Sequence, residues 1–328
     1  MNVLVTGGAG YIGSHTVRAL KSAGHHPIVY DNLSTGHHEA VAGETVVVSD
    51  VREKARLVET MQRYEVEAIV HFAAKSLVGE SMTHPAEYYE NNVAGGIALL
   101  EAARACGVTY VVFSSTAAVY GEPVEVPIPE EHPLIPTSVY GRTKLAFEQI
   151  LRDYAPAYGL RYVALRYFNA AGADPSGEIG EDHNPETHLI PIVLQTALGL
   201  RESVTVFGTD YPTPDGTCIR DYVHVCDLAA AHVLALERLS AGGPSGVYNL
   251  GNGEGFSVRE VIETAERVTG RRIPCVEGPR RPGDPARLIA SQSRAEAELG
   301  WSRQYASLEQ IIETAWKWHR AHPRGFEA

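Results

Sequence analysis

The chain has few cysteines, and none of them lies close to another in the sequence. Cys106, Cys218, Cys226 and Cys275 are the only four among 328 residues, and they form no C-x-x-C pair. This scatter excludes the disulfide framework of a small secreted domain and argues against a cysteine-based zinc site. We therefore expect a protein of a reducing compartment that binds no metal.

Long apolar runs and an excess of positive charge are also missing. No apolar run reaches the roughly 18 residues of a membrane span, and Met1 leads directly into a predicted strand without a charged and then apolar leader. The 28 basic residues are outnumbered by 40 acidic ones, for a formal net charge of -12. No general basic surface is thus offered to nucleic acid or to an anionic membrane. We expect a cytoplasmic protein, with neither as a partner, in which an anionic ligand needs a local basic patch.

Short β-branched runs alternate with longer helical segments in the first half of the chain. This alternation is typical of a parallel sheet with helices on both faces, so we expect an α/β fold, a doubly wound parallel sheet of the Rossmann type. Glycines stand where the helices should stop, at 24, 107 and 159. The expected strands are Asn2–Thr6, Pro27–Tyr30, Thr45–Val48, Ala68–Phe72, Tyr110–Ser114 and Arg161–Tyr167, and the expected helices include Tyr11–Ala23, Ala86–Cys106 and Val139–Tyr158.

The amino-acid composition changes after Asn169. Stretches rich in Gly, Pro and Asp separate shorter elements from there on, which predicts a smaller C-terminal domain whose loops face the first. The segment GVYNL at Gly246–Leu250 has the composition of a strand that returns to the main sheet. We therefore expect two interleaved domains, residues 1–172 with return elements around 215–250, and residues 173–328.

A glycine-rich turn joins the first expected strand to the first expected helix. The order strand, glycine turn, helix is the context in which such a motif indicates dinucleotide binding, because a pyrophosphate must approach the helix N-terminus without a Cβ in the way. Two registers fit, one from Gly7 and one from Gly8, each continuing through Gly10 and Gly13. Asp31 directly follows the second expected strand, at about the distance where a carboxylate binds the ribose of NAD and repels the 2'-phosphate of NADP. The pattern therefore predicts NAD.

A tyrosine and a lysine form the second chemical pattern. Tyr140 and Lys144 lie four residues apart at the start of an expected helix, so they share one face of it. Tyrosine, with an ordinary pKa of about 10, is a poor base at neutral pH, but a neighbouring ammonium favours the phenolate. Ser114-Ser115-Thr116 ends the preceding strand at the carboxyl edge, where ligands bind in such sheets. Together with the glycine turn, this arrangement predicts an acid/base site that handles a substrate hydroxyl.

These residues resemble the extended short-chain dehydrogenase/reductases, through TGGAGYIG near the N-terminus and YGRTK as the Tyr-x-x-x-Lys element. Within that group the chain is similar, from end to end, to the UDP-glucose 4-epimerase (UDP-galactose 4-epimerase) family. The central segments after Arg166 are far more specific than the glycine motif. The similarity is carried by VLVTGGAGYIGSHT, DNLSTG, HFAAKSLVGES, YYENNVAG, FSSTAAVYG, LRYFNAAGADPSGEIGED, FGTDYPTPDGTCIRDYVHV, YNLGNG and RRPGD.

The resemblance implies reversible C4 epimerisation of UDP-galactose and UDP-glucose on tightly bound NAD. Tyr140 would take the proton of the sugar 4-hydroxyl while the C4 hydride passes to NAD; the 4-keto sugar would turn over, and the hydride would return to its other face. Lys144 would lower the pKa of Tyr140 and hold the nicotinamide ribose, and Thr116 fills the hydroxyl position. The implied cofactor-binding residues are Gly7, Gly10, Tyr11, Ile12, Gly13, Asp31, Asn32, Asp50, Val51, Phe72, Asn92, Ser114, Tyr140, Lys144 and Tyr167.

The same resemblance assigns the substrate end and the assembly. Arginine forks suit phosphate and would supply the local positive charge that the acidic chain lacks. Without that ligand chemistry, Arg220 and Asp221 would be a local ion pair and Asp284 a turn residue. A homodimer is implied through Ala86–Cys106 and Val139–Tyr158, with NAD on the first domain and the UDP-hexose mainly on the second. The implied substrate contacts are Asn169, Arg220 and Arg281 for the phosphates, Asp284 for the uridine ribose, Phe207 and Leu189 for the uracil, and Thr116 for the sugar.

Two departures from the family pattern bear on the cofactor and the substrate. Lys75 stands one position before the lysine that contacts the cofactor in some members, with Ser76 in the expected place, so its role is open. Leu288 replaces the tyrosine or cysteine that governs tolerance of an N-acetyl group. Leucine is intermediate in size, so the use of UDP-N-acetylglucosamine is open as well.

Several rival functions share the fold. A nucleotide-sugar 4,6-dehydratase needs an Asp-Glu pair directly after the threonine, and this chain has Ala117 and Ala118 there. Epimerases of UDP-uronates or UDP-pentoses remain close alternatives, whereas a silent NAD-binding regulator has no need of the catalytic trio. Zinc or haem chemistry has little support, since the histidines at 25, 26, 37 and 38 are typical of solvated loops.

Overall fold

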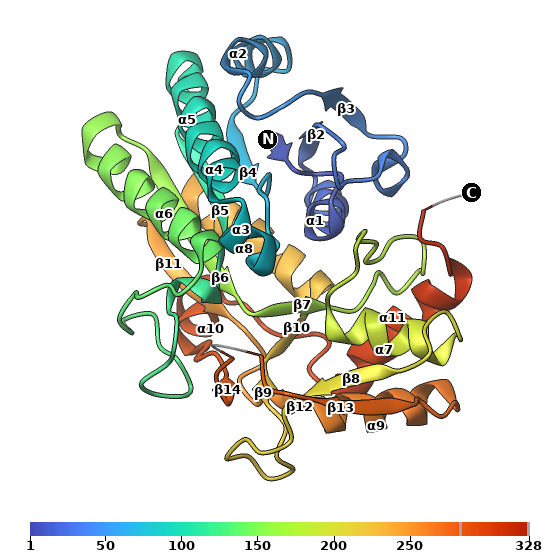
Figure 1. Ribbon diagram of the computed structural model, residues 1–328. Helices are drawn as coiled ribbons and strands as arrows, with labels where there is room; N and C mark the ends of the chain where they lie inside the picture. Colours follow the sequence, from blue (N-terminus) through green and yellow to red (C-terminus); the bar gives the residue numbers. More distant parts are fainter. Residues whose placement is uncertain (282–283, 327–328) are drawn as a thin grey trace.

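Seven parallel strands form the central sheet of the computed structural model, which describes residues 1–281 and 284–326 (Figure 1). Their order across the sheet is β11, β6, β5, β4, β1, β2, β3. The expected strands are all present, and β5 runs two residues further than predicted, to Thr116. Their bounds are β1 (Asn2–Thr6), β2 (His26–Asp31), β3 (Thr45–Val48), β4 (Ala68–His71), β5 (Tyr110–Thr116), β6 (Arg161–Tyr167) and β11 (Gly246–Leu250).

Helices cover both faces of this sheet, because its strands are apolar on both sides. In β1, Val3 and Val5 face one layer and Leu4 the other, as the alternation of side chains along a strand requires. The Val3 side packs under α1 (Tyr11–Ser22), α8 (Val225–Ser240) and α10 (Ser293–Leu299). The Leu4 side packs under α2 (Lys54–Arg63), α5 (Gly95–Cys106) and α6 (Val139–Tyr158). The doubly wound parallel sheet expected from the alternation is confirmed.

One expected helix, Ala86–Cys106, is interrupted in the structure. It consists of α4 (Pro85–Tyr88), a π-helical stretch η2 (Tyr89–Ala94) and α5. A Cβ added at Gly96, near the start of α5, would lie 2.4 Å from the ring of Phe147 on α6. This contact brings the two helices close together, and the wider π turn before it directs Asn92 into the interior, where it is 4% exposed.

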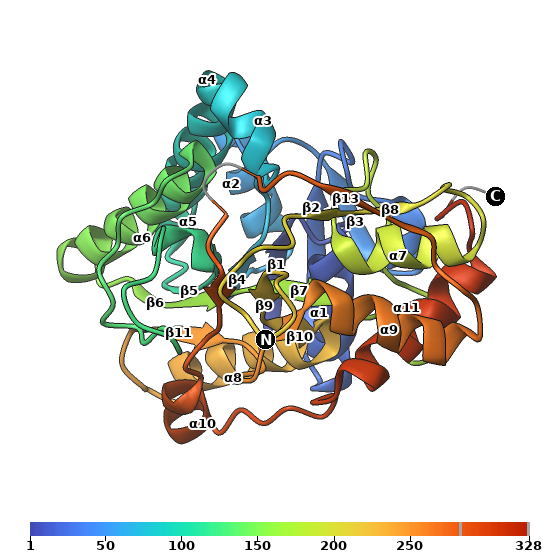
Figure 2. The same ribbon diagram turned by 60° about the horizontal axis from the view of Figure 1, so that its bottom comes forward.

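The C-terminal half forms a second cluster beside the sheet (Figure 2). Its core lies among α7 (Leu189–Ala197), α9 (Val258–Thr269) and α11 (Leu308–Ala321), over the pair β8 (Val204–Phe207) and β13 (Cys275–Gly278). The small strands that link the halves are β7 (Asn169–Ala171), β9 (Ile219–Arg220), β10 (Tyr222–His224), β12 (Phe256–Ser257) and β14 (Arg287–Leu288), and the remaining short helices are η1 (His38–Val41), α3 (Val78–Thr83) and η3 (Ala117–Val119).

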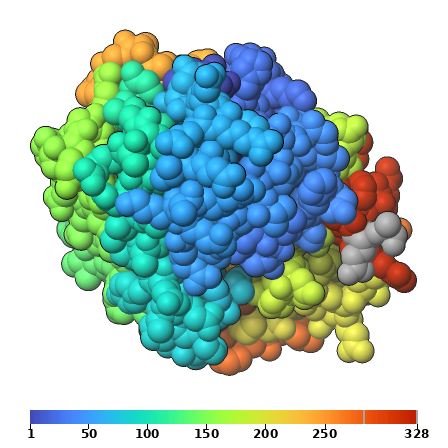
Figure 3. Space-filling model, turned by 90° about the horizontal axis from the view of Figure 1, so that it is seen from above, coloured from blue at the N-terminus to red at the C-terminus, as the bar shows by residue number. Residues whose placement is uncertain are grey.

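The last strand of the main sheet comes from this second half of the chain. As expected for Gly246–Leu250, β11 pairs in parallel with β6, so the chain crosses back before it finishes. Viewed from above, the segment up to α6 (blue to green) covers most of the face, and later segments lie along its lower and right edges and at the upper left (Figure 3). Within the described residues no helix is both long and apolar enough to span a bilayer.

The order of the strands defines where a ligand should bind. From β1 the chain winds outward to β2 and β3, then returns to the other side of β1 with β4 and continues to β5 and β6. Such a reversal opens a crevice at the carboxyl ends of β1 and β4, the usual ligand site of an open parallel sheet. The glycine turn after β1 and the hydroxyl residues that end β5 lie along this edge.

Candidate active site

The glycine turn follows β1 and runs into the first turn of α1. Gly7 adopts a φ of +71°, and a Cβ there would lie 2.5 Å from the Ala73 backbone nitrogen. A Cβ at Gly13 would lie 2.2 Å from the Gly7 carbonyl oxygen, whereas one at Gly10 would meet its nearest described neighbour at 3.4 Å. The left-handed bend is therefore at Gly7 and not at Gly8. Gly13 permits the helix to pack on the turn, and Gly10 leaves the N-terminus of α1 open to a ligand.

Asp31 ties the end of β2 to the same turn. The carboxylate is 8% exposed and accepts hydrogen bonds from the Ala9 amide at 3.0 Å and the Leu33 amide at 2.8 Å. Burial raises the pKa of Asp31, and the two amide hydrogen bonds oppose that rise. The contact fixes a carboxylate beside the glycine turn, at the position where the sequence predicts the ribose contact.

The other predicted cofactor residues lie along the neighbouring strand ends, with differing partners. Asp50 accepts from Arg52 at 2.8 Å and from the Asn32 amide at 3.1 Å, and the Arg52 hydrogen bond chiefly lowers the pKa of Asp50 to about 2. Val51 is buried, Phe72 follows β4, and Tyr11 and Ile12 open α1. The amide of Asn92 bonds both backbone groups of Lys75, at 2.8 and 3.0 Å, and the Thr143 hydroxyl at 3.0 Å. Asn92 thus holds the chain after β4 in place.

The predicted catalytic side chains converge where β5 meets the start of α6. Lys144 is 3% exposed and donates to the Ser114 carbonyl at 2.7 Å, with its Nζ 5.9 Å from the centroid of the Tyr140 ring. The Ser114 hydroxyl hydrogen-bonds the hydroxyl of Tyr167. Thr116 ends β5, and its side chain interacts with Tyr140. Residues distant in sequence are therefore brought together as the pattern predicted.

Burial is the main cause of the pKa shifts of Tyr140 and Lys144 in the protein without ligands. Burial raises the pKa of Tyr140 to about 12, and the interaction with Thr116 opposes the rise. Burial also lowers the pKa of Lys144 to about 7, against the field of Glu148, which raises it. A lysine with that pKa is only partly charged at neutral pH. The lowering of the tyrosine pKa expected from the sequence is absent from this geometry.

The two alanines form the turn η3 directly after Thr116. The Ala118 amide donates to the Thr116 hydroxyl at 3.1 Å. A Cβ at Gly141 would lie 2.5 Å from the Ala118 carbonyl oxygen, so the turn packs tightly on the first turn of α6. Position 117 is half-buried. The two side chains that follow Thr116 in the turn are thus methyl groups, which can neither donate nor accept a proton in the reaction.

Some of the predicted substrate residues contact one another in pairs, one pair at β9 and one at β8. Arg220 Nη2 lies 3.0 Å from Asp284 Oδ1, and the guanidinium carbon of Arg281 lies 4.2 Å from the centroid of the Phe207 ring. Leu288 pairs in register with Arg220, in β14. Asn169 is the first residue of β7, and its side-chain amide donates to the Asp221 carbonyl at 2.8 Å. Leu189 is the first residue of α7.

The local pairing considered for Arg220 and Asp221 is wrong. Asp221 is fully buried and accepts instead from the amides of Gly253 and Ala290, each at 3.0 Å, and from that of Asn252. Adjacent residues of an extended chain point to opposite sides, so the two side chains cannot meet. The ammonium of Lys75, whose role the sequence leaves open, pairs with Glu87.

Comparison with known proteins identifies the family. The model of the "NAD dependent epimerase/dehydratase family" matches residues 3–251. The chain belongs to this family. A UDP-glucose 4-epimerase of Halalkalibacterium halodurans is 57% identical over 326 residues, which cover 99% of this chain and 98% of that relative.

Solved members of the family share the whole fold. A UDP-glucose 4-epimerase from Brucella ovis, in complex with NAD, superposes with a TM-score of 0.94 at 53% identity, covering 96% of this chain and 97% of that one. A UDP-glucose 4-epimerase from Bifidobacterium longum, in complex with NAD+ and UDP, gives a TM-score of 0.93 at 41% identity, covering 99% of this chain and 100% of that one. The similarity therefore extends over both halves of the chain.

One pair of charged residues near the predicted catalytic residues was missed in the sequence. Glu148 on α6 and Arg166 on β6 are 1% and 2% exposed, with Arg166 Nη2 2.6 Å from Glu148 Oε2. The Ser115 hydroxyl donates to Glu148 at 2.5 Å, and Arg166 donates to the Tyr120 hydroxyl at 3.0 Å. An arginine inside the apolar strand LRYF was the available signal, because a buried charge needs a partner. This pair fixes the end of β5 against α6.

Proposed function

We propose that this protein reversibly epimerises carbon 4 of UDP-galactose and UDP-glucose through a 4-keto intermediate, using tightly bound NAD. The observation that carries the proposal is the convergence of Tyr140, Lys144 and Thr116 at the end of β5, on the same edge of the sheet as the glycine turn after β1. The names of the family members with which the chain is half or more identical support the same reaction.

The residues at the sheet edge fit NAD. Gly10 leaves the amides at the start of α1 accessible to a pyrophosphate, and Asp31 holds a carboxylate beside the turn, which favours a ribose over a 2'-phosphate. NAD, when bound, accepts the C4 hydride of the sugar and returns it. We propose as its binding residues Gly7, Gly10, Tyr11, Ile12, Gly13, Asp31, Asn32, Asp50, Val51, Phe72, Asn92, Ser114, Tyr140, Lys144 and Tyr167.

Tyr140 is the proposed acid and base. Its phenolate takes the proton of the sugar 4-hydroxyl. It returns the proton after the 4-keto sugar has turned over in the site. Thr116, at the end of β5, orients the sugar 4-hydroxyl, and Lys144 carries the positive charge that stabilises the Tyr140 phenolate. Burial holds the pKa of Tyr140 at about 12 in the chain alone. We propose that a fully charged Lys144 lowers it during catalysis.

Epimerisation is favoured over dehydration by the turn after Thr116. Elimination of water from the 4-keto sugar needs a further acid and base next to the substrate. Ala117 and Ala118 occupy that turn, which is packed against α6. The 4-keto sugar therefore has no proton donor or acceptor there and returns to the 4-hydroxyl form.

The nucleotide end is proposed around β9. Arg220 Nη1 donates hydrogen bonds to the carbonyls of Ile219 and Pro285, each at 2.9 Å. Its Nη2 faces Asp284. The diphosphate of the UDP-sugar would bind at Nη2 of Arg220, with Arg281 as the second cation and Asn169 as an amide donor. Asp284 would meet the uridine ribose, and Phe207 and Leu189 the uracil. This cluster supplies the local positive charge that the chain otherwise lacks.

The assembly and setting follow as finer proposals. We propose a homodimer, formed through the helices at 86–106 and 139–158, which expose Tyr89, Ile97 and Tyr158 at 43%, 39% and 51%. Exposed apolar side chains on two such helices suit an interface between copies. We further propose an NAD-binding domain at 1–172 with return elements around 215–250, a mainly UDP-sugar-binding domain at 173–328, and a cytoplasmic role in galactose metabolism.

Purified protein tests the proposal directly. It should interconvert UDP-galactose and UDP-glucose without added cofactor and release NAD when it is denatured. Protein that keeps its NAD but converts neither sugar would refute the proposed reaction. A panel with UDP-N-acetylhexosamine, UDP-uronate and UDP-pentose would define the substrate range that Leu288 leaves open.

A further inference from the structure

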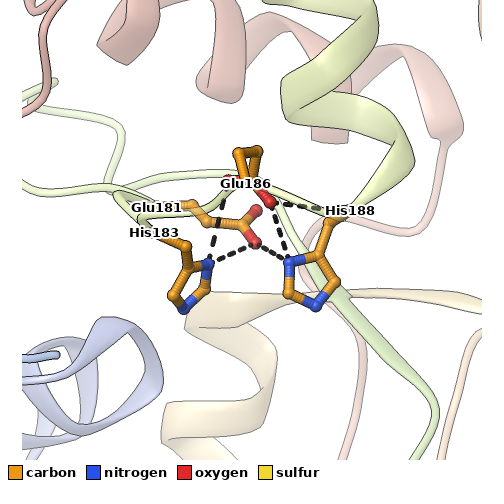
Figure 4. Close-up of side chains that lie close together, drawn as sticks. All are labelled: Glu181, His183, Glu186 and His188. Atoms are coloured by element: carbon orange, nitrogen blue, oxygen red, sulfur yellow. Dashed lines mark hydrogen bonds and ion pairs between the residues drawn. The ribbon is translucent and has the colours of Figure 1, made fainter. Parts of the chain in front are cut away.

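Four potential metal ligands lie together in the loop between β7 and α7 (Figure 4). Glu181, His183, Glu186 and His188 each offer one ligand atom, and these atoms all lie within 4.8 Å of one another. His183 Nδ1 lies 3.2 Å from Glu181 Oε1, and His188 Nδ1 lies 2.8 Å from the same oxygen. His188 Nδ1 also lies 3.1 Å from Glu186 Oε1, so both imidazoles point into one space between the carboxylates.

The hydrogen bonds of the cluster leave a ligand position open. Within the described residues, the buried Nδ1 of His183 makes no hydrogen bond, although a carboxylate oxygen is 3.2 Å away. The carboxylates of Glu181 and Glu186 are 4% and 3% exposed, and buried carboxylates require a compensating positive charge. A buried imidazole nitrogen that makes no hydrogen bond, beside two buried carboxylates, can serve as a ligand of a cation.

The separations match a small tetrahedral ion. Zinc bound at 2.0–2.2 Å by nitrogen and oxygen places its ligands roughly 3.3 Å apart. The four imidazole-to-carboxylate separations lie between 2.8 and 3.8 Å, with both oxygens of Glu186 in use, and one ligand atom from each residue lies within 4.8 Å of the other three. Two neutral imidazoles and two carboxylates also balance the charge of a divalent cation, and mixed nitrogen and oxygen ligands suit zinc.

We infer that Glu181, His183, Glu186 and His188 form a zinc site. The four residues have no step in the proposed reaction, and the site revises the expectation of a protein without metal. Glu186 Oε1 is oriented by the amides of Thr187 and His188, at 2.7 and 2.8 Å, as the ligands of metal sites usually are. The His188 side chain is 48% exposed, which gives the ion a path from solvent.

The position of the site indicates a structural role. His188 directly precedes α7, and the Glu181 carbonyl accepts from the Trp318 indole of α11 at 3.1 Å. On the other side, the ring of Tyr11 meets that of His183 edge to face, with centroids 6.1 Å apart, and its hydroxyl donates to Gly172 at 2.6 Å. The ion would therefore link the glycine turn of the first half to α7 and α11 of the second.

The alternative is an ion network without metal. The carboxylates of Glu181 and Glu186, against the effect of burial, raise the pKa of His183 to about 9. Two imidazolium groups would then neutralise the carboxylates by themselves. The two cases differ in metal content, which decides between them.

The test is metal analysis of the full-length protein. Wild-type protein, stripped with a chelator and then dialysed against zinc chloride, should retain one zinc per chain, and its melting temperature should rise on reloading. The variant His183→Gln/His188→Gln should retain less than a tenth of that zinc, and zinc should not shift its melting temperature. The control His84→Gln changes an exposed histidine and should load like the wild type. Wild-type protein that retains no zinc, or a double variant that retains as much, would overturn the inference.

A second measurement covers the case in which the double variant does not fold. Cobalt(II) added to stripped wild-type protein should give the intense visible absorption of a tetrahedral site, and zinc should abolish it. A weak octahedral spectrum, or none, would contradict the proposed geometry. Retention of manganese or iron in preference to zinc would do the same.

Discussion

Replacement of Tyr140 by phenylalanine removes a single hydroxyl from the proposed site. General acid/base catalysis by a positioned side chain contributes about 10²–10⁴-fold, so the variant should lose that much turnover, or roughly 3–5 kcal/mol of transition-state stabilisation. The fold should tolerate the change. The ring stays in place, and the interaction lost is that with Thr116, worth about 1 kcal/mol for one neutral hydrogen bond.

Three readings separate catalysis from folding in this variant. Initial rates of UDP-galactose conversion give kcat, the NAD released on denaturation gives cofactor content, and thermal unfolding gives stability. Tyr154→Phe is a matched control on the same helix, because it removes a hydroxyl bonded to Glu101 at 3.1 Å, away from the site. The control should keep kcat within about twofold. A Tyr140→Phe enzyme with near-normal kcat would remove Tyr140 as the proton carrier.

Three further changes test other parts of the account. Gly13→Ala should impair folding, since its Cβ would lie 2.2 Å from a backbone oxygen, whereas Gly10→Ala, at 3.4 Å, should fold but purify with little NAD. Burial lowers the pKa of His71 to about 3 and of His232 to about 4, from 6.5; the unfolded chain then binds more protons below pH 6.5, so each histidine should cost about 2 kcal/mol of stability between pH 7 and pH 5. Glu148→Gln should destabilise the fold by about 3–5 kcal/mol, because it leaves a buried arginine without its partner.

The controls for these changes use the same measurements. Gly79→Ala has no described atom within 4 Å of its new Cβ and should behave as wild type in folding and NAD content. In urea titrations, His71→Gln should lose about 2 kcal/mol of the difference between pH 7 and pH 5; an unchanged difference would contradict the buried neutral histidine. Equal NAD content in Gly10→Ala and wild type would argue against the pyrophosphate position, and a fully stable Glu148→Gln would show that the ion pair is dispensable.

The sheet and the placement of the candidate catalytic residues could be predicted because local patterns determine them. A continuous apolar run such as YVVF forms a buried parallel strand wherever helices cover both faces, and Tyr140 and Lys144 share a helix face by spacing alone. The edge that brings Thr116 to them follows from the winding of a parallel sheet. These features depend on short stretches of sequence and on a general topology.

The remaining features depend on tertiary contacts that no short pattern encodes. The π turn at 89–94 arises where α5 meets Phe147 of α6. The pairing of Arg220 with Asp284 joins residues 64 positions apart, and the raised pKa of Tyr140 results from burial by the whole fold. The loop at 181–188 is polar in sequence, and its histidines became notable only when the structure placed both Nδ1 atoms on one carboxylate.

The route of the C4 hydrogen tests the central claim most directly. UDP-galactose deuterated at carbon 4 should give UDP-glucose that retains the deuterium at carbon 4, with no hydrogen taken from water, because the hydride leaves to bound NAD and returns to the same carbon. The product can be analysed by mass spectrometry and NMR after several turnovers in ordinary water. Loss of the deuterium to solvent would show that the hydrogen leaves as a proton, and would contradict oxidation and reduction on NAD at this site.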